Sequence, residues 1–101
     1  MLVHDLEALR CPDATIQMRK VIECFVGGAS EALTLKTIEP SLLRSLKAFN
    51  VEKGYGLKIK SSSVNITEVQ RSTWAEDYYE EDYSDVDKVT VLSIFKVCDK
   101  N

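Results

Sequence analysis

Carboxylates and tyrosines are concentrated in one short segment of the chain, residues 76–87. This segment contains seven Asp or Glu, three Tyr and no Lys or Arg. The whole chain has a net charge of -3, so the other residues carry all 13 basic side chains and 9 of the 16 acidic ones. Because burying unpaired charge is costly, such a segment has to face water or a cationic partner. The sequence therefore predicts a mildly basic body and an acidic, aromatic segment.

The side chains that usually perform catalysis are sparse in this chain. The one histidine, His4, lies close to the N-terminus, and no nucleophile elbow, phosphate loop or dinucleotide-binding motif is present. Three widely spaced cysteines, Cys11, Cys24 and Cys98, are unlike a secreted disulfide framework. We expect structural thiols, with Cys24 beside the apolar face of a helix and Cys98 at the end of a strand. The chain is therefore predicted not to be an enzyme.

Metal binding is disfavoured by the spacing of the possible ligands. The chain has no Cys-x-x-Cys pair and a single histidine, which argues against zinc. The acidic segment lacks the alternating Asp pattern and the glycine of a calcium-binding loop. We therefore predict no metal and no cofactor.

Length and composition predict a single small globular domain over residues 1–101. A chain of 101 residues has too little material for two cores. It contains no apolar run of about 18 residues, which disfavours a membrane span. The N-terminus lacks the basic and continuous apolar regions of a signal peptide. We therefore expect a cytoplasmic protein with no membrane association.

Two main helices are predicted in the first half of the chain. The first apolar stripe consists of Ala14, Met18, Val21, Ile22 and Phe25, and the second of Leu42, Leu43, Leu46 and Phe49. Asp13 is placed to cap the first helix and the glycines after residue 26 to end it, which predicts a helix over about 13–26. Pro40 suits the first turn of the second helix, over about 40–49. The spacing of Leu2, Leu6 and Leu9 predicts one or two further helical turns.

The second half of the chain reads as strands. Residues 57–61 and about 64–72 alternate in polarity on either side of three serines, which predicts a hairpin with its turn at the serines. Residues 89–97 are apolar on both faces, which predicts a central strand. Residues 32–38 favour a strand or a loop. The predicted fold is α+β, with two helices on a mostly antiparallel sheet of three to five strands and an acidic, aromatic loop at about 75–88.

The acidic, aromatic loop is the candidate contact surface. The predicted partner-binding residues are Trp74, Glu76, Asp77, Tyr78, Tyr79, Glu80, Glu81, Asp82, Tyr83 and Asp85. Tyr and Trp anchor interfaces with large area and little entropy to lose, and carboxylates complement a basic surface. We therefore predict a non-enzymatic protein-binding module, in the manner of a small inhibitor, immunity or antagonist protein, whose partner presents a basic surface.

Two alternatives remain open at the level of sequence. The first is RNA or DNA binding through a basic hairpin face, with Lys53, Lys58, Lys60 and Arg71 as the contacts and the acidic loop as a gate. The acidic isoelectric point of about 5.1 disfavours it. The second is a homodimer formed through the last strand.

Overall fold

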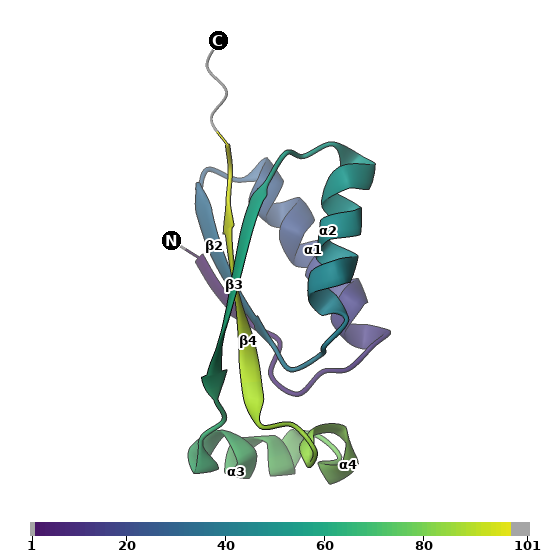
Figure 1. Cartoon of the computed structure of the whole chain (residues 1–101), viewed down its shortest axis with the longest axis vertical. Helices are drawn as coiled ribbons and strands as arrows, with labels where there is room; N and C mark the ends of the chain where they lie inside the picture. Colours follow the sequence, from purple (N-terminus) through teal and green to yellow (C-terminus); the bar gives the residue numbers. More distant parts are fainter. Residues whose placement is uncertain (1, 98–101) are drawn as a thin grey trace.

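The chain folds as one sheet with helices packed against it. The computed structural model describes residues 2–97, which form four helices and a four-stranded mixed sheet (Figure 1). In chain order the elements are β1 (Leu2–Asp5), α1 (Asp13–Gly27), β2 (Ala32–Thr37), α2 (Leu42–Lys53), β3 (Lys58–Asn65), α3 (Glu68–Asp77), α4 (Glu80–Tyr83) and β4 (Lys88–Phe95). The predicted α+β class is confirmed.

The strand order in the sheet is β1-β2-β4-β3. β1 is parallel to β2, and both other pairs are antiparallel, so the sheet is mostly antiparallel as predicted. β4 lies between β2 and β3, which confirms the central strand predicted over 89–97. Helices α1 and α2 cover one face of the sheet (Figure 1). The main core between these layers contains Leu33, Leu35, Leu92 and Ile94 from the two central strands.

Helix α1 occupies residues Asp13–Gly27, close to the predicted range. Its core stripe of Ala14, Met18, Ile22 and Phe25 is at most 1% exposed. The predicted capping role of Asp13 is wrong, because Pro12 is the N-cap residue and no side chain caps the helix. Asp13 instead lies in the first turn, where its charge suits the positive end of the helix.

Helix α2 occupies residues Leu42–Lys53 and is longer than predicted. Asn50, where the helix was expected to end, lies inside it and both donates to and accepts from the main chain of Leu57, at 3.0 Å each. The helix ends at Gly54, whose φ of 67° lies in the left-handed region that glycine adopts without strain. The predicted helix end at Asn50 is therefore wrong, because the Asn50 side chain anchors the following loop while its backbone continues the helix.

The N-terminal residues form a strand where helical turns were expected. Leu2–Asp5 is β1, which pairs in parallel with β2, and Leu6 is 2% exposed in the main core. The helical spacing of Leu2, Leu6 and Leu9 was therefore coincidental, because these leucines belong to a strand and the loop after it.

The predicted hairpin of 57–61 with 64–72 is wrong. Residues 61–63, expected at a turn, lie inside β3, which pairs with β4 from Lys58 opposite Phe95 to Asn65 opposite Lys88. The residues that follow begin helix α3 through a capping box: Gln70 N donates to Thr67 Oγ1 at 3.1 Å, and Thr67 N donates to Gln70 Oε1 at 3.0 Å. Thr67-x-x-Gln70 was a helix-start signal visible in the sequence.

Candidate functional site

The predicted loop at 75–88 is wrong in part, because residues 75–77 and 80–83 are helical. Helices α3 and α4 meet at a two-residue joint, Tyr78 and Tyr79, and form a separate layer at one end of the molecule (Figure 1). We call residues 68–87 the acidic lobe and the remainder of the described chain the body. The carboxylates of the acidic lobe repel one another. Since the lobe is folded nevertheless, other side chains in it have to be buried.

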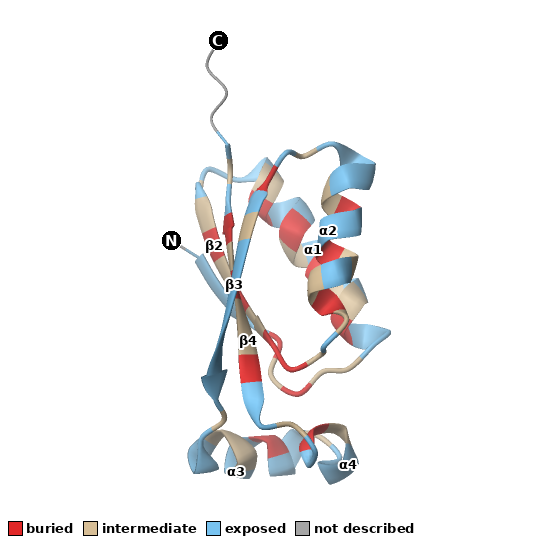
Figure 2. Ribbon diagram, in the orientation of Figure 1, coloured by how far each residue is buried: buried red, intermediate tan, exposed pale blue. Residues whose placement is uncertain are grey.

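The acidic lobe is built on a small core of its own. Trp74 is 3% exposed and Tyr83 is 5% exposed, and their rings meet edge to face with centroids 5.6 Å apart. They pack with Ala8, Ile38 and Val89, which belong to the body. Figure 2 shows buried segments in α3, in α4 and near the start of β4, at the same end of the molecule. The Trp74 and Tyr83 side chains therefore anchor the lobe to the body and leave little surface for the predicted contact with a partner.

Arg71 also has a structural role inside the acidic lobe. Its guanidinium donates to the carbonyl oxygens of Val86, at 2.6 Å, and Tyr83, at 3.4 Å. Arg71 belongs to α3, so its predicted place beside a basic strand face is wrong. Lys58 and Lys60 do share a strand face, and since neighbouring Ile59 is paired with buried Ile94, both lysines point away from the helices.

Lys53, the last of the predicted basic contacts, lies in the helical layer. Its Nζ is 5.9 Å from the centre of the Phe49 ring on α2, on the side of the sheet opposite Lys58 and Lys60. The four basic residues are therefore not brought together on one face.

An arginine of the body, held in an ion pair there, donates a hydrogen bond to the acidic lobe. Arg10 donates through Nη1 to the carbonyl oxygen of Asp82, at 2.7 Å, and through Nε to Glu39 Oε1, at 2.9 Å. Glu39 also accepts from the main chain of Cys11 and from Ser41. Burial opposes the charge of Glu39, but the hydrogen bonds from Arg10, Ser41 and Cys11 outweigh it and lower its pKa to about 2.

The surface of the acidic lobe carries the predicted carboxylates. Of the seven in residues 76–87, Asp82 is half-buried and the other six are exposed. Tyr79 is 78% exposed at the joint between the two helices. Tyr78 is half-buried and donates through its hydroxyl to Glu7 Oε1 at 3.3 Å; burial and the nearby charge of Glu7 raise its pKa, so it stays protonated.

Two hollows share the tyrosine joint in their lining. The first, which we call the lobe cleft, has a volume of about 370 Å³ and separates the acidic lobe from the body. It is lined by Ala8, Leu9, Arg10, Cys11, Asp13, Asp77, Tyr78, Tyr79 and Asp82. The second hollow, of about 400 Å³, lies on the lobe alone and shares Asp77, Tyr78 and Tyr79 with the first. Both hollows combine aromatic rings with carboxylates.

Cys11 lines the lobe cleft, which sequence reasoning did not anticipate. Its thiol is exposed, and Sγ lies 3.0 Å from Thr15 Oγ1 and 3.5 Å from Ser41 Oγ. Cys24 is exposed as well, so burial gives no support to the structural role expected for these thiols. Cys98 lies outside the described residues. The signal that could have placed Cys11 at the surface is its position directly before the first turn of a helix, outside the apolar stripe.

Other kinds of site were sought across residues 2–97. In that range no three His, Cys, Asp or Glu side chains are grouped to hold a metal ion. No helix there is both long enough and apolar enough to cross a bilayer. No protein-family model, curated protein or solved structure matches this chain. Its function must therefore be inferred from its own geometry.

Proposed function

We propose that this chain is a non-enzymatic protein-binding module whose acidic lobe receives a basic surface of a partner protein. The observation that carries the proposal is the position of Tyr79, 78% exposed in the lining of two hollows and surrounded by exposed carboxylates. An aromatic side chain left open to water while Trp74 and Tyr83 beside it are buried is available as an anchor.

The hollows suit the cationic side chains of a partner. A guanidinium or ammonium group placed over Tyr79 gains a cation–π contact, and Asp77 supplies a charge-assisted hydrogen bond in the same hollow. The other exposed carboxylates attract the partner from a distance and speed its encounter. Recognition of lysine or arginine side chains is therefore the chemistry that we assign to the acidic lobe.

The rigidity of the lobe supports this role. Tyr78 of the tyrosine joint packs against the buried core that contains Trp74 and Tyr83, and Arg71 donates a hydrogen bond to the chain that leads into β4. Because these contacts already fix the backbone around Tyr79, little conformational entropy remains to be lost on binding. The Cys11 thiol in the wall of the lobe cleft would lie close to a docked partner.

The proposed biological setting is that of a small cytoplasmic inhibitor, immunity or antagonist protein that covers a cationic site on a larger target. Size and acidity favour it. The alternative of nucleic-acid binding loses support, because Arg71 is used within the lobe and Lys53 lies in the helical layer, which leaves Lys58 and Lys60 on the open sheet face.

The proposal is tested by NMR titration of the chain with short arginine-containing and lysine-containing peptides. Shifts should centre on Tyr78 and Tyr79 and weaken in a Glu80→Gln/Glu81→Gln variant. A Glu31→Gln/Glu52→Gln variant is the matched control. It removes the same number of charges, but from exposed acids of the body. Equal weakening in both variants would indicate a general charge effect. Shifts centred on Lys58 and Lys60, with an oligonucleotide as ligand, would favour the alternative.

A further inference from the structure

Strand β1 is an edge strand with apolar side chains exposed on both faces. Among the described residues β1 pairs with β2 alone, so its outer edge has no partner strand. Leu2 is 47% exposed on the face of the sheet that carries the helices, and Val3 is 61% exposed on the opposite face. Edge strands of monomers are usually protected by charge, proline or a covering segment, and the middle of β1 lacks all three.

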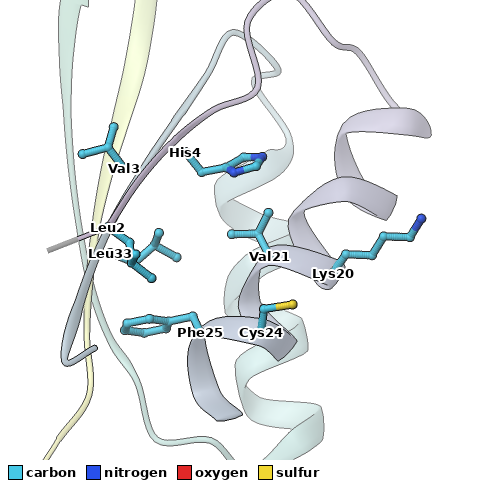
Figure 3. Close-up of a pocket in the computed structure, with 8 residues that line it drawn as sticks. All are labelled: Leu2, Val3, His4, Lys20, Val21, Cys24, Phe25 and Leu33. Carbon is cyan, nitrogen blue, oxygen red and sulfur yellow. The ribbon is translucent and has the colours of Figure 1, made fainter. Parts of the chain in front are cut away.

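An apolar groove runs beside this edge, between β1 and α1. Its volume is about 320 Å³. Figure 3 shows its lining residues: Leu2, Val3, His4, Lys20, Val21, Cys24, Phe25 and Leu33. His4 on β1 faces Val21 on α1 across the groove, the Phe25 ring reaches toward the strand, and Lys20 extends away from it (Figure 3). The unpaired strand edge and the unfilled groove are therefore parts of one surface.

The other edge of the sheet is different. β3 also has a partner on one side only, but its exposed side chains are mostly lysine and serine. Polar, charged side chains are the usual protection of an edge that stays solvated. The last strand, β4, has a neighbour on each side, so it offers no free edge for the predicted dimerisation through the last strand. If two copies pair strand to strand, β1 is the edge that fits.

We propose that two copies of this chain associate through β1, antiparallel about a twofold axis at Val3, to form a continuous eight-stranded sheet. The axis sets Val3 opposite Val3 and Leu2 opposite His4, so that apolar side chains are covered on both faces. A contact of this kind is self-complementary and closed, and it leaves no β1 edge exposed.

The unpaired backbone of β1 favours a second copy as the occupant, because the same edge of another chain offers matching donors and acceptors. Residues Leu2 and His4 line the groove together with Lys20 and Cys24, so the middle of β1 is level with this part of α1. The same twofold axis brings the two α1 helices antiparallel at that level. The α1 side chains nearest this seam are those that line the groove, among them Val21 and Cys24, so two partly covered apolar surfaces meet.

The proposed interface leaves the acidic lobe free. The lobe packs on the first residues of β4 and on the loops that contain Ala8 and Ile38. Strand β1 begins on the side of the sheet away from the lobe (Figure 1). The dimer would present two acidic lobes to partners. Its formation does not depend on the function proposed for the lobe.

The test is analytical ultracentrifugation of the full chain, with any tag at the C-terminus, over a range of concentrations. Wild type should show a reversible monomer–dimer equilibrium. Val3→Asp should raise the dissociation constant by roughly tenfold or more, because like charges then face each other across the axis. Val64→Asp on β3 and Val69→Asp on α3 are matched controls, since both valines are more than half exposed, at 51% and 73%, and lie off the proposed interface.

A mixing experiment keeps the result independent of any effect on folding. V3D and V3K chains should each be monomeric alone, and an equimolar mixture should restore the dimer because opposite charges then meet. A wild type that stays monomeric at every concentration would overturn the proposal. So would a dimer that Val64→Asp breaks and Val3→Asp leaves intact, which would place the contact at β3, or association only in the presence of an added apolar peptide.

Discussion

The body and the acidic lobe each have a buried core, and the two cores differ in size and in what they leave at the surface. In the described chain, 13 buried residues form the core of the body and 5 form that of the lobe, of which Trp74 and Tyr83 come from the lobe itself. The lobe is completed by main-chain hydrogen bonds to Arg10 and Arg71. A region that needs few side chains for its own stability can leave the others for binding.

The largest expected effect concerns the core of the body. Phe25→Ala or Ile22→Ala removes a side chain that is at most 1% exposed between α1 and the sheet. We expect each to lower the free energy of unfolding by about 2–5 kcal/mol, through lost apolar burial and the cavity that remains. Urea melts followed by circular dichroism measure this. A nearly unchanged free energy of unfolding in both variants would show that the apolar stripe of α1 does not stabilise the fold.

The next effect concerns the core of the lobe. We expect Trp74→Ala to lower the free energy of unfolding by about 3 kcal/mol, the lower end of the range for such truncations. The reason is that the core around Trp74 is smaller than the core around Phe25. Hydrogen exchange should rise mainly in α3 and α4, with the body still protected. Tyr79→Ala is the matched aromatic control, since its ring is 78% exposed, and it should change stability little. Uniform loss of protection in Trp74→Ala would show that lobe and body unfold together.

Acid should loosen the joint between the two regions. The pKa of Glu39 is lowered from 4.5 to about 2, so the stabilisation it gives is complete above pH 4.5 and is lost as the pH falls toward 2. We expect a loss of about 1–2 kcal/mol from this group, a modest value because solvent screens part of the interaction. Thermal melts across this range should show the decline, and Glu39→Gln should flatten it. An unchanged pH profile in Glu39→Gln would exclude this linkage.

The smallest effect on stability is expected at the surface of the lobe. Glu80→Gln/Glu81→Gln relieves repulsion in a segment of one charge sign but removes acids from the first turn of α4, where they suit the helix end. These opposing terms should leave the free energy of unfolding within about 0.5 kcal/mol of wild type. A melt that shows a loss above about 2 kcal/mol would mean that the carboxylates belong to a buried network.

The contrast between the two regions also explains what the sequence could predict. Helix α1 and strand β4 follow regular apolar periodicity, because each buries a long face, and both were placed within a few residues. The lobe was missed because Trp74 and Tyr83 lie nine residues apart on two different helices, so that their contact has no local period. The Thr67–Gln70 capping box is the local signal for the start of α3. The carboxylates that follow it favour a loop, so their pattern alone does not predict the helices.

The sequence predicts the acidic, aromatic segment as the candidate site, but it does not predict which of its residues are buried and which are exposed. Three clustered tyrosines have similar local context, and the fold buries Tyr83, half-buries Tyr78 and exposes Tyr79. Which of them faces water depends on Ala8 and Ile38, which come from distant loops of the body. The same is true of Cys11, which enters the lobe cleft because the β1–α1 loop packs under the lobe.

The central claim is that Tyr79 and the carboxylates around it receive a basic partner surface. Its most direct test is surface plasmon resonance against a captured partner or a cationic peptide, at two salt concentrations. The association rate should fall with salt and in Glu80→Gln/Glu81→Gln, because the charges act before contact. Tyr79→Ala should instead raise the dissociation rate and cost about 2 kcal/mol or more of binding free energy. Unchanged kinetics in both variants and at both salt concentrations would contradict the claim.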